Sequence, residues 1–115
     1  MFDFQKLTVY QKSKDFNLSV FTLLKEYQFD RVTHDQLRRA SFSIMLNIAE
    51  GSARFSNRDR KNFLVIARGS VFECAAILEF LSETNQFEHK FAEAFMLTLE
   101  ELSKMLFALI KRLEK

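Results

Sequence analysis

From residue 86 to residue 115 the chain reads QFEHKFAEAFMLTLEELSKMLFALIKRLEK. Apolar side chains recur in this stretch at alternating spacings of four and three residues. They are Phe95, Leu99, Leu102, Leu106, Leu109 and Leu113. This spacing puts them on one stripe of an α-helix, as in antiparallel bundles and coiled coils. The stretch therefore predicts a long amphipathic helix that packs against other helices.

The same spacing upstream predicts three further helices, and the four expected ranges are about 9–27, 34–50, 57–84 and 87–114. The expected inner stripes of the first three are Val9, Ser13, Phe16, Val20, Leu23 and Tyr27, then Leu37, Ala40, Ile44 and Ile48, then Phe63, Ile66, Ser70, Cys74, Ile77 and Leu81. A polar pair that resembles a capping box precedes each helix. The pairs are Thr8 with Gln11, Thr33 with Gln36, Ser56 with Asp59, and Asn85 with Glu88. Gly51 is expected to end or bend the second helix.

The length and composition favour one helical domain. The chain has 115 residues, no Pro and only two Gly, so it carries little turn punctuation. A chain of this length forms a single domain, expected to span residues 1–115. Loops of a few residues join antiparallel neighbours, which predicts an all-α, up-down-up-down four-helix bundle.

The sequence contains no recognisable catalytic or metal-binding motif. CxxC, HExxH, P-loop and GxSxG patterns are absent, and neither His34 nor His89 follows a glutamate by three residues. Cys74 falls on an inner stripe, where a thiol behaves as a small apolar side chain. We therefore expect no enzyme, no cofactor, no metal and no small-molecule substrate.

The chain also lacks membrane and export signals. Its longest apolar runs are five residues, whereas a membrane-spanning helix needs about 20. A carboxylate stands third in the chain, and no apolar segment follows a basic start, so the N-terminus does not read as a secretory signal. With a single Cys no intrachain disulfide can form. These features predict a cytoplasmic protein without a membrane partner.

The two middle helices carry more apolar surface than a four-helix core requires. The side chains opposite the inner stripes are Phe42, Leu46 and Ala49 in the second helix and Val65, Gly69, Phe72, Ala76 and Phe80 in the third. A helix that is apolar on two sides is buried on two sides. We predict that a second copy of the chain covers this surface. The alternative is that wide helix packing makes both stripes internal.

Positive charge concentrates in the middle of the chain. From Arg31 to Arg68 eight basic residues face three acidic ones, a net charge of +5, whereas the stretch from Gly69 onward has a net charge of −3. The candidate nucleic-acid-binding residues are Arg38, Arg39, Arg54, Arg58, Lys61 and Arg68. Cations in the first turns of the third helix oppose its dipole, which an anionic partner would compensate. The alternative is that Arg54 caps the carbonyl end of the second helix and the others are solvated. Aromatic residues do not interleave with these charges as in a single-strand binder.

One set of motifs is specific. The segments Gln36-Leu37-Arg38-Arg39-Ala40, Ser43-Ile44 and Asn47-Ile48-Ala49-Glu50-Gly51, with Arg54 and Ser56, resemble the signature of the 23S rRNA-intervening sequence proteins. These are small bacterial four-helix-bundle proteins. Met45-Leu46 replaces a Pro-Ser usual in that family, and Ala53 replaces a second glycine.

The resemblance implies a left-handed antiparallel bundle that assembles as a homopentamer. A related branch serves as the accessory protein of diversity-generating retroelements, where a basic pentamer is thought to hold RNA. The sequence thus predicts a non-enzymatic self-assembling scaffold, with an RNA-binding accessory protein as the alternative.

Four polar residues lie near the inner edges of the second and third helices: Asn47, Glu50, Ser70 and Glu73. Polar groups in such positions must be paired. We expect Arg38 or Arg39 to bond Glu50 or Glu73, within the chain or across subunits. This network would fix the register between helices, a structural rather than a catalytic role.

Overall fold

The computed structural model describes residues 1–114 and is all-α, without a strand among those residues. A short 3₁₀ helix, η1 (Asp3–Lys6), precedes four long helices. These are α1 (Thr8–Glu26), α2 (Arg31–Ser52), α3 (Asn57–Glu83) and α4 (His89–Leu113). The prediction of an all-α fold with four helices is confirmed, and each observed bound lies within three residues of the expected one.

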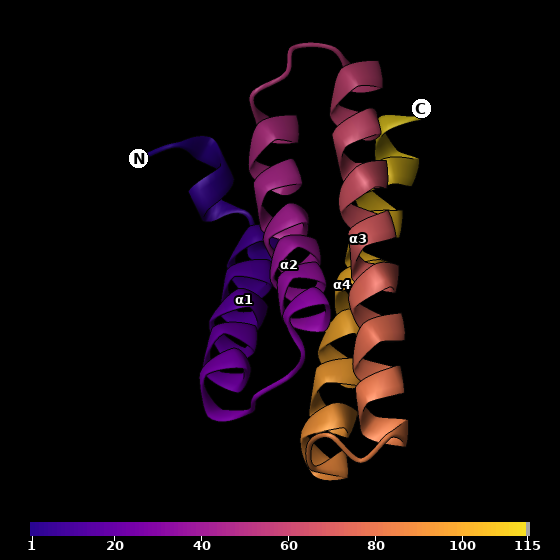
Figure 1. Ribbon diagram of the computed structural model, residues 1–115. Helices are drawn as coiled ribbons and strands as arrows, with labels where there is room; N and C mark the ends of the chain where they lie inside the picture. Colours follow the sequence, from indigo (N-terminus) through magenta and orange to yellow (C-terminus); the bar gives the residue numbers. More distant parts are fainter. Residues whose placement is uncertain (115) are drawn as a thin grey trace.

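The four helices surround one core in chain order. α2 packs most extensively on α3, α3 packs on α4, and α1 packs on α2, whereas α1 and α4 share the smallest contact. The diagonal pairs, α1 with α3 and α2 with α4, do not meet. In Figure 1 the α1–α2 and α3–α4 connections lie at one end of the molecule and the α2–α3 connection at the other. The surfaces of the α2–α3 pair and the α1–α4 pair therefore face opposite ways.

The helix ends correct several expectations. Of the four predicted caps, only Ser56 caps its helix. The Ser56 hydroxyl accepts a hydrogen bond from the backbone N–H of Asp59 at 3.1 Å, at the start of α3. Thr8 lies inside α1, and α2 begins two residues before Thr33, so neither residue is a cap. Asn85 instead adopts a left-handed φ of 58° in the α3–α4 turn, and its side chain meets His89 Nε2 at 3.1 Å. Short polar pairs are common in sequences, so their spacing alone did not distinguish Ser56 from the three predicted residues that do not cap a helix.

Gly51 does not end α2, which continues to Ser52. A Cβ atom at Gly51 would lie 3.1 Å from the Cβ of Phe63 and 3.4 Å from the carbonyl oxygen of Arg60. Glycine is favoured here because α2 and the start of α3 approach closely, so a Cβ would make a tight contact. Its φ is not positive, so backbone freedom is not the reason.

The core uses the predicted stripes of α1, α2 and α4, but the predicted stripe of α3 is partly wrong. Ile66 is half exposed, and the buried apolar side chains of α3 are Leu64, Ala67, Val71, Cys74, Leu78 and Leu81. Two stripes with similar spacing coexist on this helix, and periodicity cannot rank them. Contacts with α2 on one side and α4 on the other select the stripe with the smaller side chains.

Aromatic side chains close the core near the α1–α2 and α3–α4 connections. Phe87, outside the predicted stripes, is buried and lies 6.2 Å from Tyr27 and 6.4 Å from Phe29 and Phe95, measured between ring centroids. Edge-to-face and tilted contacts of this kind add about 0.5–1.5 kcal/mol each beyond burial. Within residues 1–114, no helix combines the length and apolarity that crossing a membrane requires.

A matched pair of substitutions on α4 tests the core. Leu102 is fully buried and Leu97 is 70% exposed. We expect Leu102→Ala to lower the free energy of unfolding by about 3 kcal/mol, because it removes buried methyl groups and leaves a cavity. Leu97→Ala should change it by less than about 0.5 kcal/mol. Urea unfolding followed by circular dichroism measures both, and equal losses would contradict this packing.

Candidate interaction surface on helices α2 and α3

The second apolar stripes of α2 and α3 lie on the outside of the bundle. Phe42, Leu46, Val65 and Phe72 are 45–56% exposed, and Phe80 is 61% exposed. Gly69 and Ala76 are also exposed, and Ala49 is half-buried. The alternative that both stripes are internal is wrong for the single chain, because these side chains face solvent.

Gly69 lies within this exposed stripe, and the chain itself gives no reason for a glycine there. Apart from its two chain neighbours and the nearby backbone of α3 itself, no atom lies within 4 Å of the position that a Cβ would take. The helical backbone has a negative φ, which any residue adopts. Contact with Phe63 inside the chain disfavours a side chain at Gly51, whereas no such contact exists at Gly69.

Small polar side chains join α2 to α3 below this surface. The hydroxyl of Ser70 donates to the hydroxyl of Ser43 at 2.8 Å. The amide of Asn47 donates to the carbonyl oxygen of Ser43 at 2.8 Å and to its hydroxyl at 3.0 Å. Ser43 is thus the centre of this group, although the sequence analysis quoted it only in the family signature and not in the expected polar network. The sequence indicated this role for Ser43 only by spacing, because Ser43 lies four residues before Asn47 and therefore on the same helix face.

Glu50 and Glu73 do not share that group, and each pairs with an arginine. Arg39 donates to Glu73 at 2.5 Å across the α2–α3 contact and to the side-chain oxygen of Gln36 at 2.9 Å. Arg54, in the α2–α3 connection, donates to Glu50 of α2 at 2.6 Å. The four expected network residues therefore form three separate arrangements, of which two cross between helices.

Arg54 also closes the α2–α3 contact from the side. Its guanidinium lies 4.6 Å from the ring centroid of Phe63, and its Nε is buried without a hydrogen-bond partner among the described residues. The Nε of Arg60 donates to the carbonyl oxygen of Arg54 at 2.7 Å, within the α2–α3 connection and beyond the end of α2 at Ser52. The Arg54 side chain bonds the Glu50 carboxylate and not a carbonyl of α2, so the expected capping role of Arg54 is wrong.

Two more candidate nucleic-acid residues have partners on α4. Arg68 lies 4.9 Å from the ring of Phe72 and 5.4 Å from that of Phe107, and its Nε donates to the carbonyl of Ser103 at 3.3 Å. Lys61 pairs with Glu114 at 2.9 Å. Hydrogen bonds from Lys61 and then Lys111 lower the pKa of the Glu114 carboxyl below its usual value.

Arg38, Arg58 and Arg68 form no ion pair within residues 1–114. Arg38 and Arg58 are also exposed, whereas Arg68 is half-buried against its aromatic partners. Arg38 lies 5.9 Å from the ring centroid of Phe42, so the charge and an exposed apolar side chain are neighbours on α2. Of the six basic candidates, these two keep the most charge available to a partner.

Phe55 is a candidate that the sequence analysis missed. It lies in the α2–α3 connection, and its side chain is 100% exposed, next to Arg54 and three residues before Arg58. The expectation that no aromatic residue interleaves with the basic charges is therefore wrong at this turn. The available signal was a phenylalanine directly before the cap Ser56, in a segment with no apolar neighbour to cover it.

The comparisons with known proteins identify the family. A family model described as 23S rRNA-intervening sequence protein matches residues 5–108. The chain belongs to this family. Among curated proteins there is no match.

A solved structure has the same fold. It is a 1.70 Å crystal structure of a protein of unknown function from the S23 ribosomal protein family of Bacteroides thetaiotaomicron VPI-5482. The two chains are 30% identical with a TM-score of 0.85, over 90% of this chain and 99% of the other. The resemblance predicted from the QLRRA and NIAEG segments is thus confirmed for the family.

The buried thiol of Cys74 gives this family member a measurable property. Burial raises the pKa of Cys74 from 9.0 to about 12, with a smaller contribution from Glu73. The thiolate is the reactive form, so we expect native protein to react with iodoacetamide at pH 8 far more slowly than urea-unfolded protein. Because the folded pKa is raised, the native thiol should stay protonated as the pH rises past 9, where the unfolded thiol ionises. Mass spectrometry of labelled protein measures this, and equal rates would contradict the burial of Cys74.

Proposed function

We propose that this protein is a non-enzymatic, self-assembling four-helix-bundle scaffold, a homopentamer as its family resemblance implies. The observation that carries the proposal is the exposed apolar surface of α2 and α3, with Leu46 and Phe72 each at least half exposed. Large contiguous apolar surface on a soluble domain marks an interaction site. Burying a fully exposed Leu or Phe contributes about 1.5–3 kcal/mol, so the half still exposed here contributes about 1 kcal/mol per side chain.

The location of polar pairs supports assembly through this surface. Arg39 and Glu73 satisfy one another within the chain, as do Arg54 and Glu50. Their charges can therefore lie at the edge of a subunit contact without an unpaired ion. Gly69 adds a position where another backbone can approach, since nothing in its own chain occupies that space.

The finer architecture and the location belong to the same proposal. The helices form an antiparallel up-down-up-down bundle, which the alternation of the loops between the two ends of the molecule supports (Figure 1), and the bundle is left-handed as the family resemblance implies. The scaffold works in the bacterial cytoplasm, which is consistent with one buried, unpaired cysteine.

A second candidate function is RNA binding at the α2–α3 turn. Phe55 is fully exposed there, and Arg58 has no acidic partner within residues 1–114. An exposed aromatic ring can stack on an unpaired base, and a nearby cation can contact the phosphate backbone. The other basic candidates support this function less, because Arg39, Arg54 and Lys61 are paired with carboxylates.

Light scattering tests the scaffold. We expect wild-type protein to be an oligomer at micromolar concentration and Leu46→Glu and Phe72→Glu to be monomers, because each variant places a charge in an apolar contact. Val32→Glu is the matched control, since Val32 is 67% exposed in the first turn of α2, away from these side chains. A wild-type protein that is strictly monomeric would remove the proposal.

Gel shift or fluorescence titration with single-stranded RNA tests the second function. Phe55→Ala should weaken binding by roughly 5- to 100-fold, since stacking contributes about 1–3 kcal/mol per base. Arg58→Ala should lower the slope of log affinity against log salt by about one. Phe21→Ala, which removes a 52% exposed ring from α1, should leave binding unchanged. No binding even at low salt would exclude RNA as the ligand.

A further inference from the structure

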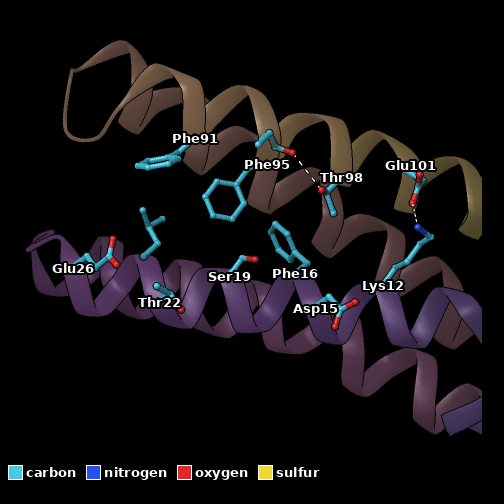
Figure 2. Close-up of a pocket in the computed structure, with 12 residues that line it drawn as sticks. Lys12, Asp15, Phe16, Ser19, Thr22, Glu26, Phe91, Phe95, Thr98 and Glu101 are labelled. Carbon is cyan, nitrogen blue, oxygen red and sulfur yellow. Dashed lines mark hydrogen bonds and ion pairs between the residues drawn. The ribbon is translucent and has the colours of Figure 1, made fainter.

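An open groove runs along the side of the bundle opposite the α2–α3 surface. It lies between α1 and α4, the neighbouring helices with the smallest mutual contact, and encloses about 610 Å³. Figure 2 shows Phe16 of α1 and Phe91 and Phe95 of α4 projecting into the space between the two helices. The groove therefore has an apolar floor that no segment of the described chain covers.

The rim of the groove is acidic. Asp15 and Glu26 on α1 and Glu101 on α4 line it, and Lys12 is the one basic residue among its lining side chains. Lys12 pairs with Glu101 at 2.6 Å. Asp15 and Glu26 form no ion pair with any residue from 1 to 114. Two carboxylates thus remain available to a cationic partner.

The exposed side of α2 has the complementary form and charge. Phe42, Leu46 and Ala49 follow one another at spacings of four and three and make a narrow ridge, here called the α2 ridge. Anchors at this spacing are how an amphipathic helix enters an apolar groove. Arg38, one turn before Phe42, lies beside its ring and has no acidic partner in the described chain. The ridge therefore offers apolar anchors and one available positive charge.

The two helices that form the groove carry exposed apolar side chains. Phe91, which lines the groove, is 38% exposed, and Leu18 on α1 and Leu97 on α4 are 58% and 70% exposed. An assembly that paired only the α2–α3 surfaces with one another would leave these side chains in water. A contact between the α1–α4 side of one copy and the α2–α3 surface of another would cover apolar side chains on both.

We propose that the α1–α4 groove of one copy receives the α2 ridge of a second copy. The inference rests on the proposed self-assembly and identifies the surfaces that meet. The contact is heterologous, because ridge and groove lie on opposite sides of each chain, so every copy offers one of each to its neighbours. Such a contact closes into a ring when the rotation between copies allows it. Asp15 and Glu26 lie about 16 Å apart along α1, so one of the two carboxylates then faces the positive charge of Arg38 across the contact.

A groove-blocking variant tests the proposal. Ala94 lines the groove and is exposed, so Ala94→Arg fills it and adds a positive charge without entering the core. Ala108→Arg is the matched control, since Ala108 is exposed on the same helix outside the groove. We expect Ala94→Arg to raise the dissociation constant of the oligomer by roughly a hundredfold and Ala108→Arg to leave it near wild type. Circular dichroism checks that both variants keep their helix content.

Mixing two defective variants gives the decisive result. Ala94→Arg keeps its ridge and Leu46→Glu keeps its groove, so together they should form a one-to-one complex although neither assembles alone. Absence of this complex in sedimentation or light scattering overturns the inference. An oligomeric Ala94→Arg beside a monomeric Leu46→Glu also overturns it, and in that case self-assembly through α2 and α3 stands. A monomeric wild type removes the proposed function itself.

Discussion

The close approach of α2 to α3 is the contact on which the rest of the structure depends. Gly51 lies against the Cβ of Phe63, and Ser43 meets Ser70 at hydrogen-bond distance. Small side chains at these points let the two backbones come together, and the hydroxyls remain paired after burial. The ion pair between Arg39 of α2 and Glu73 of α3 also joins the two helices at the edge of the same contact.

The α2–α3 contact also limits how much apolar surface the two helices can bury. Leu37, Ile44 and Ile48 of α2 enter the core, as do Leu64 and Leu78 of α3. The second stripe of each helix lies on the opposite side, so Leu46 of α2 and Phe72 of α3 stay exposed in the single chain. The apolar surface that supports self-assembly is thus what this core leaves uncovered.

The same packing redistributes the positive charge of the middle segment. Glu50, Glu73 and Glu114 each pair with a basic candidate, and only one of these pairs joins α2 to α3. Net charge counted along the sequence therefore overstates the charge that a partner meets. Among the exposed candidates, Arg38 and Arg58 retain it; Arg38 lies beside the exposed ring of Phe42, and Arg58 follows the exposed Phe55 by three residues.

The sequence by itself determined the four helices, the inner stripes of α1, α2 and α4, and the family, because periodic apolar spacing and the QLRRA and NIAEG segments are local patterns. It could not rank the two stripes of α3, assign Gly51 to a close contact, or place Ser43 in the polar group between α2 and α3. Nor could it show that Phe55 is exposed or that a groove separates α1 from α4. Those features depend on which helices are neighbours and how tightly each pair packs. Only the tertiary structure decides this, because side chains far apart in the chain must fill one space together.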